Sequence, residues 1–446
     1  MAEIFPFRAY RYNAARVQPA EVLTQPYDKI TPAMQERYYA ASPYNLIAVE
    51  KGKAEQSDNA TRNVYTRARQ ALDSWMAAEI LIPEPAPAIY AYFQQFTLPG
   101  TRENRTRRGF IALGRVEDYA AGVVHRHEHT LSGPRADRLE LLRHTCAHTG
   151  QLFMLYRDPQ RRMDVLLDGV AAAAPAVDLR DEYGVVHCLW PVTDPSVTQQ
   201  FVAAMAGKKL VIADGHHRYE TAVAYRDECR TAQGCASPSA PYEKVMMTFV
   251  NSESEGLTIF PTHRVLAGVP GFSADALLRT LAPWFDVRAF DATGVGDSAR
   301  PEASGLAAFR QALLVARAQR AIGLYAGGSF RLLTLKPHTN LAALVSEVSP
   351  AQLQLDVVLL HRVILEKGLG ITPEAVAQES HIRYEREMEN AVSAVNNNST
   401  QACFLLNAVA VQQVMEMALA GEVLPQKSTD FYPKMLSGIA IYRLEE

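Results

Sequence analysis

A dense run of polar residues follows a short apolar segment near the middle of the chain. Asp214–Arg218, which reads Asp-Gly-His-His-Arg, comes directly after Leu210–Ala213, a run typical of a buried strand. A helical pattern begins just beyond, so two imidazoles and a guanidinium fall in the first turn of a helix. That turn has backbone N–H groups without intrahelical partners and the positive end of the helix dipole. The pattern predicts a phosphate-binding turn with Asp214 as its N-cap, or alternatively a capped helix with a charged first turn.

A second polar cluster lies between residues 125 and 138. In an extended segment His127 and His129 face one way, and Glu128 faces the other. A helix is expected to start near Ser132 and Pro134. One interpretation makes Glu128 a general base and Arg138 a phosphate partner, and another is a structural salt-bridge network. A metal site built from His127, His129, His216 and His217 is a third interpretation, although the spacing lacks the HExxH pattern.

Three further stretches carry side chains that could bind a ligand. Asp28 follows Pro26-Tyr27, although an aspartate before Thr31-Pro32 is also a common helix start. His263 and Arg264 follow an apolar run, and Lys427, Ser428 and Thr429 lie in a polar loop suited to an anion. The arginine-rich connection 100–107 is expected to be a solvated hairpin tip.

The elements that must position these residues can be read from periodicity. Strands alternate with helices throughout, which favours a mixed α/β chain. The pattern of the predicted elements changes near residue 268, where we expect a domain boundary. The expected helices are 32–41, 59–79, 194–205, 274–282, 303–319, 355–366 and 410–420. The expected strands are 45–50, 89–96, 108–116, 151–156, 184–190, 210–213, 244–251, 322–326, 330–335, 402–407 and 438–442.

Composition limits the class of protein. The chain has 446 residues and a net charge of -3, which disfavours nucleic-acid binding through bulk electrostatics. Its five cysteines include no CxxC pair, so we expect a reducing, cytoplasmic location. No segment has the pattern of a signal peptide or of a membrane span, so no membrane partner is expected.

The motifs together resemble a known family. The matching stretches run from one end of the chain to the other, and the chain is similar to the family called domain of unknown function ten-fifteen. Its Asp-Gly-His-His-Arg core also resembles the phosphate-binding motif of the ParB and sulfiredoxin superfamily, which includes free-serine kinases. The stretches are Phe5–Ala9, Pro26–Asp28, His127–Thr130, Ala213–Glu220, Pro261–Arg264 and Lys427–Thr429.

The resemblance implies an α+β (mixed α/β) fold with a ParB/sulfiredoxin-like nucleotide-binding core at 1–267 and an additional C-terminal α/β region at 268–446. It implies transfer of a phosphate from ADP or ATP, with Mg²⁺, to a small hydroxylated acceptor, of which free L-serine is the expected one. The alternative is a nucleotide-binding or nucleotide-hydrolysing regulatory protein of ParB-like type. Glu128 and His217 would be catalytic. The residues that bind the phosphate groups would be Asp214, Gly215, His216, His217, Arg218 and Arg138. Asp214 would also be a candidate Mg²⁺ ligand. The secondary or substrate-binding residues would be Asp28, His127, His263, Arg264, Lys427, Ser428 and Thr429.

Overall fold

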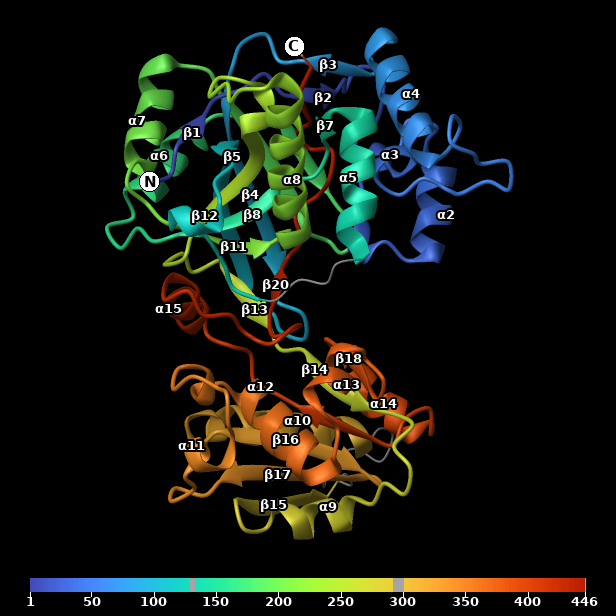
Figure 1. Cartoon of the computed structure of the whole chain (residues 1–446), viewed down its shortest axis with the longest axis vertical. Helices are drawn as coiled ribbons and strands as arrows, with labels where there is room; N and C mark the ends of the chain where they lie inside the picture. The colour runs from blue at the N-terminus through green and yellow to red at the C-terminus, as the bar shows by residue number, and fades with distance from the viewer. Residues whose placement is uncertain (129–132, 292–300, 446) are drawn as a thin grey trace. The chain divides into compact units, whose positions relative to one another are not determined.

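The computed structural model describes residues 1–128, 133–291 and 301–445 and divides the chain into two compact units. Unit 1 is Met1–Thr258 together with Phe431–Glu446, and unit 2 is Ile259–Asp430 (Figure 1). Unit 1 therefore includes a C-terminal segment that the expected division at residue 268 assigns to the second region. Two strands lie where the chain passes from one unit to the other, β13 at Thr258–Phe260 and β20 at Asp430–Tyr432.

Unit 1 is built on a large mixed sheet. Its strand order is β6-β11-β8-β12-β5-β4-β10-β9, with β1 paired to β5. The pairs β6/β11 and β8/β12 are parallel and the other pairs are antiparallel. The strands are β1 Ile4–Phe5, β4 Ile89–Thr97, β5 Asn104–Arg115, β6 Val124–Arg126, β8 Leu152–Tyr156, β9 Val177–Arg180, β10 Val186–Val192, β11 Leu210–Asp214 and β12 Lys244–Asn251. Two short pairs join β2 Tyr10–Tyr12 to β3 Leu81–Pro83, and β7 Ala147–His148 to β21 Tyr442–Arg443.

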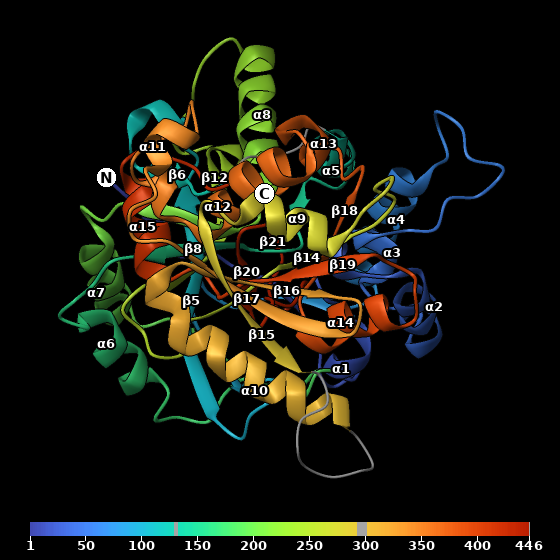
Figure 2. The ribbon, with the colours of Figure 1, turned by 90° about the horizontal axis from the view of Figure 1, so that it is seen from below.

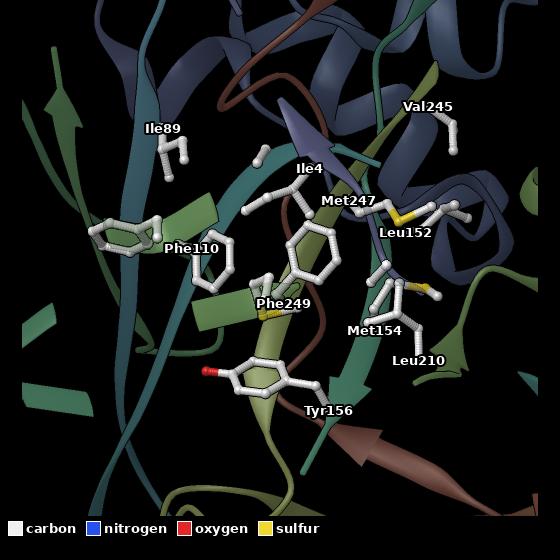
Figure 3. Close-up of a cluster of buried hydrophobic side chains, with 14 of the residues drawn as sticks. Ile4, Ile89, Phe110, Leu152, Met154, Tyr156, Leu210, Val245, Met247 and Phe249 are labelled. Atoms are coloured by element: carbon white, nitrogen blue, oxygen red, sulfur yellow. The ribbon is translucent and has the colours of Figure 1, made fainter. Parts of the chain in front are cut away.

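Alternate residues of these strands form the core of unit 1, because successive side chains point to opposite faces. Phe110, Met154 and Phe249 belong to one buried cluster (Figure 3). Helices α6, α7 and α8 cover this face, since their apolar residues join the same cluster. The helices of unit 1 are α1 Pro19–Val22, α2 Pro32–Ala41, α3 Ile47–Glu50, α4 Val64–Ala77, α5 Gly133–Thr145, α6 Arg162–Val170, α7 Pro195–Met205 and α8 His216–Gln233.

Several local predictions are confirmed and others are wrong. Helix α2 has the predicted bounds, and α7 confirms the helix expected at 194–205, with Asp194 as its N-cap. The predicted strand 45–50 is wrong, because the Asn45 side chain accepts from the Ile47 N–H and the segment turns into α3. The predicted N-cap role of Asp214 is also wrong, because Asp214 ends β11 and Gly215 precedes α8. Ser132, the predicted cap of α5, lies outside the described residues.

Unit 2 contains a second sheet, of order β15-β17-β16-β19-β14-β18. Helices α10 and α14 pack on one of its faces and share a buried cluster with it, and Figure 2 shows α10 lying across the sheet. Helix α12 continues into a π-helix, Leu360–Gly368. The strands are β14 His263–Leu266, β15 Phe285–Asp291, β16 Ala321–Ala326, β17 Ser329–Leu335, β18 Ile382–Glu385 and β19 Ala402–Leu405. The helices are α9 Ala274–Leu281, α10 Pro301–Val315, α11 Leu341–Leu344, α12 Asp356–Leu359, α13 Pro373–Ala377, α14 Met388–Asn396 and α15 Val411–Leu419.

Within the described ranges, none of the helices combines the length and the apolar character needed to cross a membrane.

Candidate functional site

The two polar clusters of the sequence lie at one edge of the unit 1 sheet. Strands β6 and β11 are parallel, with Arg126 opposite Ile212. The carboxyl ends of parallel neighbours meet at the same sheet edge, which is where ligands bind in many α/β proteins. His127 and Glu128 therefore leave β6 beside the place where Asp214 leaves β11.

A β-bulge decides where the Asp214 side chain points. Leu210 and Ile212 face the buried cluster, and strict alternation would turn Asp214 into that core as well. The register shifts between Ile212 and Asp214, so Asp214 lies opposite Phe153 instead. Bulges of this kind re-aim a side chain. The bulge keeps a carboxylate out of the apolar core and places it on the polar face of the sheet.

Asp214 is held by a cation on the adjacent helix and by cations from distant parts of the chain. Its Oδ2 accepts from Lys434 Nζ at 2.8 Å, and its Oδ1 lies 3.8 Å from Arg218 Nη2. Burial alone would raise the pKa of Asp214, but Lys434, Arg218 and Lys29 hold that pKa well below its ordinary value. Asp214 is thus a carboxylate at neutral pH. Lys434 was not among the predicted site residues.

The start of α8 needs glycine and fixes Arg218. Gly215 has φ 95°, and a Cβ there would lie 3.0 Å from Leu152 Cδ2 and 3.1 Å from Arg218 Nε and Nη2. Arg218 Nη1 donates to the Gln151 carbonyl at 2.7 Å. The buried Arg218 Nε has no hydrogen-bond partner within the described part of the chain. The first turn of α8 therefore presents one guanidinium beside its backbone N–H groups.

His127 and His216, which pack against each other at this turn, are neutral. The rings of His127 and His216 lie 4.8 Å apart, and His127 Nδ1 lies 2.6 Å from the Ile212 carbonyl. Burial lowers the pKa of His127 to about 4 and that of His216 well below its ordinary value. The His216 ring faces His127, so it contributes no positive charge to an anion. His217, one residue on, is half-buried.

Glu128 lies next to this neutral pair. Its Oε2 is 3.9 Å from His127 Nε2, and its side chain is about one-fifth exposed. The described residues include no group of three or more His, Cys, Asp or Glu that could hold a metal ion. His129, a member of the predicted metal set, lies outside those residues.

Arg107 is a second cation that the sequence did not single out. The basic connection 100–107 was expected to be solvated, and for Arg107 that expectation is wrong, because it belongs to β5 and is 1% exposed. It pairs across the strands with Gln94, donating from Nε to Oε1 at 3.0 Å. It also donates to the carbonyls of Tyr432 and Pro433, next to Lys434. Burial lowers the pKa of Arg107 to about 10, so it remains charged at neutral pH.

A small cavity of about 50 Å³ lies beside Arg218. Arg138 on α5 lines it, donating to the Glu50 carbonyl at 2.9 Å and stacking over the Tyr27 ring at 4.3 Å. Glu50 is buried, and its Oε1 accepts from Thr149 at 2.9 Å. Asp28 lies on the adjacent turn and is exposed. The cavity thus combines two guanidiniums with one buried carboxylate.

The remaining predicted residues belong to unit 2. His263 is buried, and its Nδ1 accepts from the Leu406 N–H at 3.2 Å. Arg264 is buried and donates to the Lys427 carbonyl at 3.0 Å. The Ser428 hydroxyl donates to the Pro425 carbonyl, and Thr429 follows it in the same loop.

The family follows from comparison with known proteins. A model for proteins of unknown function, DUF1015, matches residues 4–358. The chain belongs to this family. The resemblance seen in the sequence is therefore confirmed at the level of the family. A search of curated proteins finds no match.

Solved structures give distant likenesses. A conserved hypothetical protein from Pyrococcus furiosus is 13% identical with a TM-score of 0.34, covering 72% of this chain and 93% of its own. A free serine kinase in complex with AMP is 12% identical with a TM-score of 0.34, and the match covers 69% of this chain and 83% of the kinase chain. A C-terminally truncated SbnI from Staphylococcus aureus is 12% identical with a TM-score of 0.32, and the match covers 73% of this chain and 85% of the SbnI chain.

Proposed function

We propose that unit 1 is a nucleotide-dependent phosphotransferase that moves a phosphate to a small hydroxylated acceptor, with free L-serine as the acceptor. The observation that carries the proposal is the grouping of Asp214, Lys434 and Arg218 at the N-terminus of α8. Phosphoryl transfer needs positioning and neutralisation of phosphate charge more than covalent chemistry. A helix start beside two cations provides that environment.

The phosphate groups would bind at the first turn of α8. Gly215 allows close approach of the ligand to the backbone, and residues 216–218 offer first-turn N–H groups. Arg218 would pair with a phosphate oxygen through its Nε, which has no hydrogen-bond partner among the described residues. His216 would act through its backbone N–H, because its ring packs on His127. His217 would contact the transferred phosphate from the next position of the turn.

Glu128 would serve as the general base. It lies at the same sheet edge as Asp214, and its Oε2 is 3.9 Å from Nε2 of His127, which burial keeps neutral. In the proposed step the acceptor hydroxyl oxygen forms a bond to the terminal phosphorus while its proton passes to Glu128. The bond from that phosphorus to the bridging oxygen breaks, and the shortened nucleotide leaves.

The small cavity suits an acceptor with the charges of an amino acid. Arg138 and Arg218 would face its carboxylate, and the buried Glu50 would face its ammonium group. Asp28, on the turn next to the cavity, would be a secondary contact. The small volume of the cavity favours an acceptor of a few heavy atoms over a second nucleotide.

Asp214 does not fit the role of a Mg²⁺ ligand in this arrangement. One of its oxygens is taken by Lys434 and the other faces Arg218, and a metal ion would have to displace these cations. We assign no step to a protein-bound metal. Mg²⁺ that enters with ADP or ATP would be held by phosphate oxygens and water.

Two wider expectations belong to the same proposal. The sheet edge and the α8 turn would form the ParB/sulfiredoxin-like core within residues 1–267, and 268–446 would be the additional region. All five cysteines are free, which agrees with a proposed cytoplasmic location.

The test is a coupled assay of purified protein with ADP or ATP and L-serine. We expect phosphoserine to form, and we expect Glu128→Gln to abolish turnover while nucleotide binding measured by calorimetry persists. His217→Ala should lower both turnover and nucleotide affinity. Nucleotide binding without any transfer would reject the kinase and favour the regulatory alternative. Unchanged turnover in both variants would reject these two roles.

A further inference from the structure

Unit 2 contains a cavity of about 530 Å³ that the proposed function does not use. This volume lies within the range of small-molecule sites, about 300–1,000 Å³. Arg264 enters it from the start of β14, and Arg317 and Arg320 from the turn after α10. Asp356 at the start of α12 and the loop 406–409 after β19 complete the wall. Residues from these four separate parts of unit 2 therefore converge on one space.

The lining is positively charged. Among the residues that the structure describes, it holds three arginines and one acidic residue, Asp356. Arg320 Nε lies 3.2 Å from Asp356 Oδ1, so that carboxylate already has a partner. Arg317 donates to the Ala408 carbonyl at 3.1 Å and forms no ion pair with a carboxylate among the residues the structure describes. Guanidiniums that share a cavity repel one another, and an anionic ligand would relieve that repulsion.

Arg264 is fixed in place at the inner wall. It is 1% exposed, its Nε donates to His361 Nε2 at 3.2 Å, and its Nη2 donates to the Lys427 carbonyl at 3.0 Å. His361 lies on the π-helix, a rare helical conformation that often occurs at functional sites. The hydrogen bond from Arg264 to the Lys427 carbonyl therefore joins two motifs to which the kinase proposal gives no role, Pro261–Arg264 and Lys427–Thr429.

The cavity also has an apolar rim. Leu314 and Val315 line it from the end of α10 and are 55% and 71% exposed. Together they form a small exposed apolar surface beside the arginines, and ligand-binding grooves can combine apolar surface with a polar rim. A ligand with an apolar body and an anionic head would cover both the rim and the arginines.

We propose that this cavity of unit 2 is a binding site for a small phosphate monoester with an apolar body, held by Arg264, Arg317 and Arg320 and covered by Leu314 and Val315. Arginine matches the geometry of phosphate oxygens and can donate two parallel hydrogen bonds. A phosphate monoester carries close to two negative charges at neutral pH, which suits an excess of guanidinium over carboxylate. This site does not depend on the kinase proposal.

Calorimetry on the full chain with phenyl phosphate as the probe tests the proposal. Phenyl phosphate should bind, inorganic phosphate should bind about tenfold more weakly, and phenol should not bind. Arg317→Gln should weaken phenyl phosphate binding by about tenfold or more, because it removes a charge-assisted contact. Val315→Glu should weaken it as well by placing a like charge at the rim. Both positions are exposed, so neither substitution removes buried packing.

Matched controls separate this site from the rest of the molecule. Arg288→Gln and Val287→Glu make the same changes on β15, outside the cavity, and should leave the affinity unchanged. Normal binding in both Arg317→Gln and Val315→Glu, or equal loss in Arg288→Gln and Val287→Glu, would overturn the proposal. Benzoate binding as tightly as phenyl phosphate would overturn the assignment to a phosphate.

Discussion

Lys434 and Asp214 form an ion pair that the fold, not local sequence, creates. Asp214 is about one-quarter exposed and keeps its charge because Lys434 lies 2.8 Å away. Lys434→Met should lower the free energy of unfolding of unit 1 by about 1–3 kcal/mol, since it leaves a partly buried carboxylate with a more distant cation. Urea unfolding at pH 7 measures this. Lys53→Met, which breaks an exposed pair with Glu36, should cost less than about 1 kcal/mol. Equal losses in the two variants would show that the Asp214 pair is no stronger than a surface pair.

Arg107 and Arg108 are adjacent in sequence but lie in different surroundings. Arg107 is buried and donates to Gln94 and to two backbone carbonyls, whereas Arg108 is half-buried and pairs with the exposed Asp168. Arg107→Met should cost about 3 kcal/mol or more, because the buried acceptors lose their donor. Arg108→Met should cost less than about 1 kcal/mol. Thermal unfolding of the two variants side by side checks the difference, and a smaller loss for Arg107→Met would contradict it.

At the scale of elements, the turn from β11 into α8 depends on Gly215. Gly215→Ala should destabilise unit 1 by about 2 kcal/mol and weaken nucleotide binding, because φ is 95° and the added Cβ presses on Leu152 and Arg218. Gly234→Ala, at the other end of α8, is the control. Gly234 also has a positive φ, but a Cβ there meets nothing within 4 Å. We expect it to cost about 1 kcal/mol and to leave nucleotide affinity unchanged. Calorimetry and urea unfolding of both variants test this, and equal nucleotide affinities would refute it.

At the scale of the molecule, buried neutral histidines make stability depend on pH. Burial lowers the pKa of His127 and of His148 to about 4, whereas the unfolded value is about 6.5. Between these values the unfolded chain binds protons that the native chain does not. The free energy of unfolding must therefore fall as pH drops from 7 towards 4, by about 2 kcal/mol per histidine at pH 5. The depressed pKa of Asp214 acts at lower pH, because its contribution is lost only as pH falls below the ordinary aspartate value.

Urea unfolding at pH 7.5 and 5.0 measures this effect. In a Trp284→Phe protein, Trp75 and Trp190 report on unit 1 by fluorescence. His148→Phe should keep the stacking on Tyr442 and reduce the difference between the two pH values. Equal stability of the parent protein at pH 7.5 and 5.0 would contradict the prediction.

The sequence by itself determined the features that depend on neighbouring residues. The apolar run before Asp214 and the helical pattern after it predict a strand and a helix, and both are confirmed as β11 and α8. Helix α2 and strand β12 were predicted in the same way, from hydrophobic periodicity and local helix-start signals, and both are confirmed. The motif Asp214–Arg218 was visible for this reason, since its glycine and its helix start are local properties.

Only the tertiary structure decided which residues meet. Lys434 reaches Asp214 across 220 positions, and Arg107 is buried because the segment after Phe431 packs on its face of the sheet. The segment predicted as a strand at 45–50 forms α3 instead. A short apolar run suits either conformation, and the hydrogen bond that the Asn45 side chain accepts from the Ile47 N–H favours the helical turn. Pairing between strands distant in sequence depends on register, and a single bulge reverses the direction of a side chain. The sequence therefore supplied the chemical groups at Asp214–Arg218, the sheet register set the direction of Asp214, and the packing of the C-terminal segment supplied Lys434.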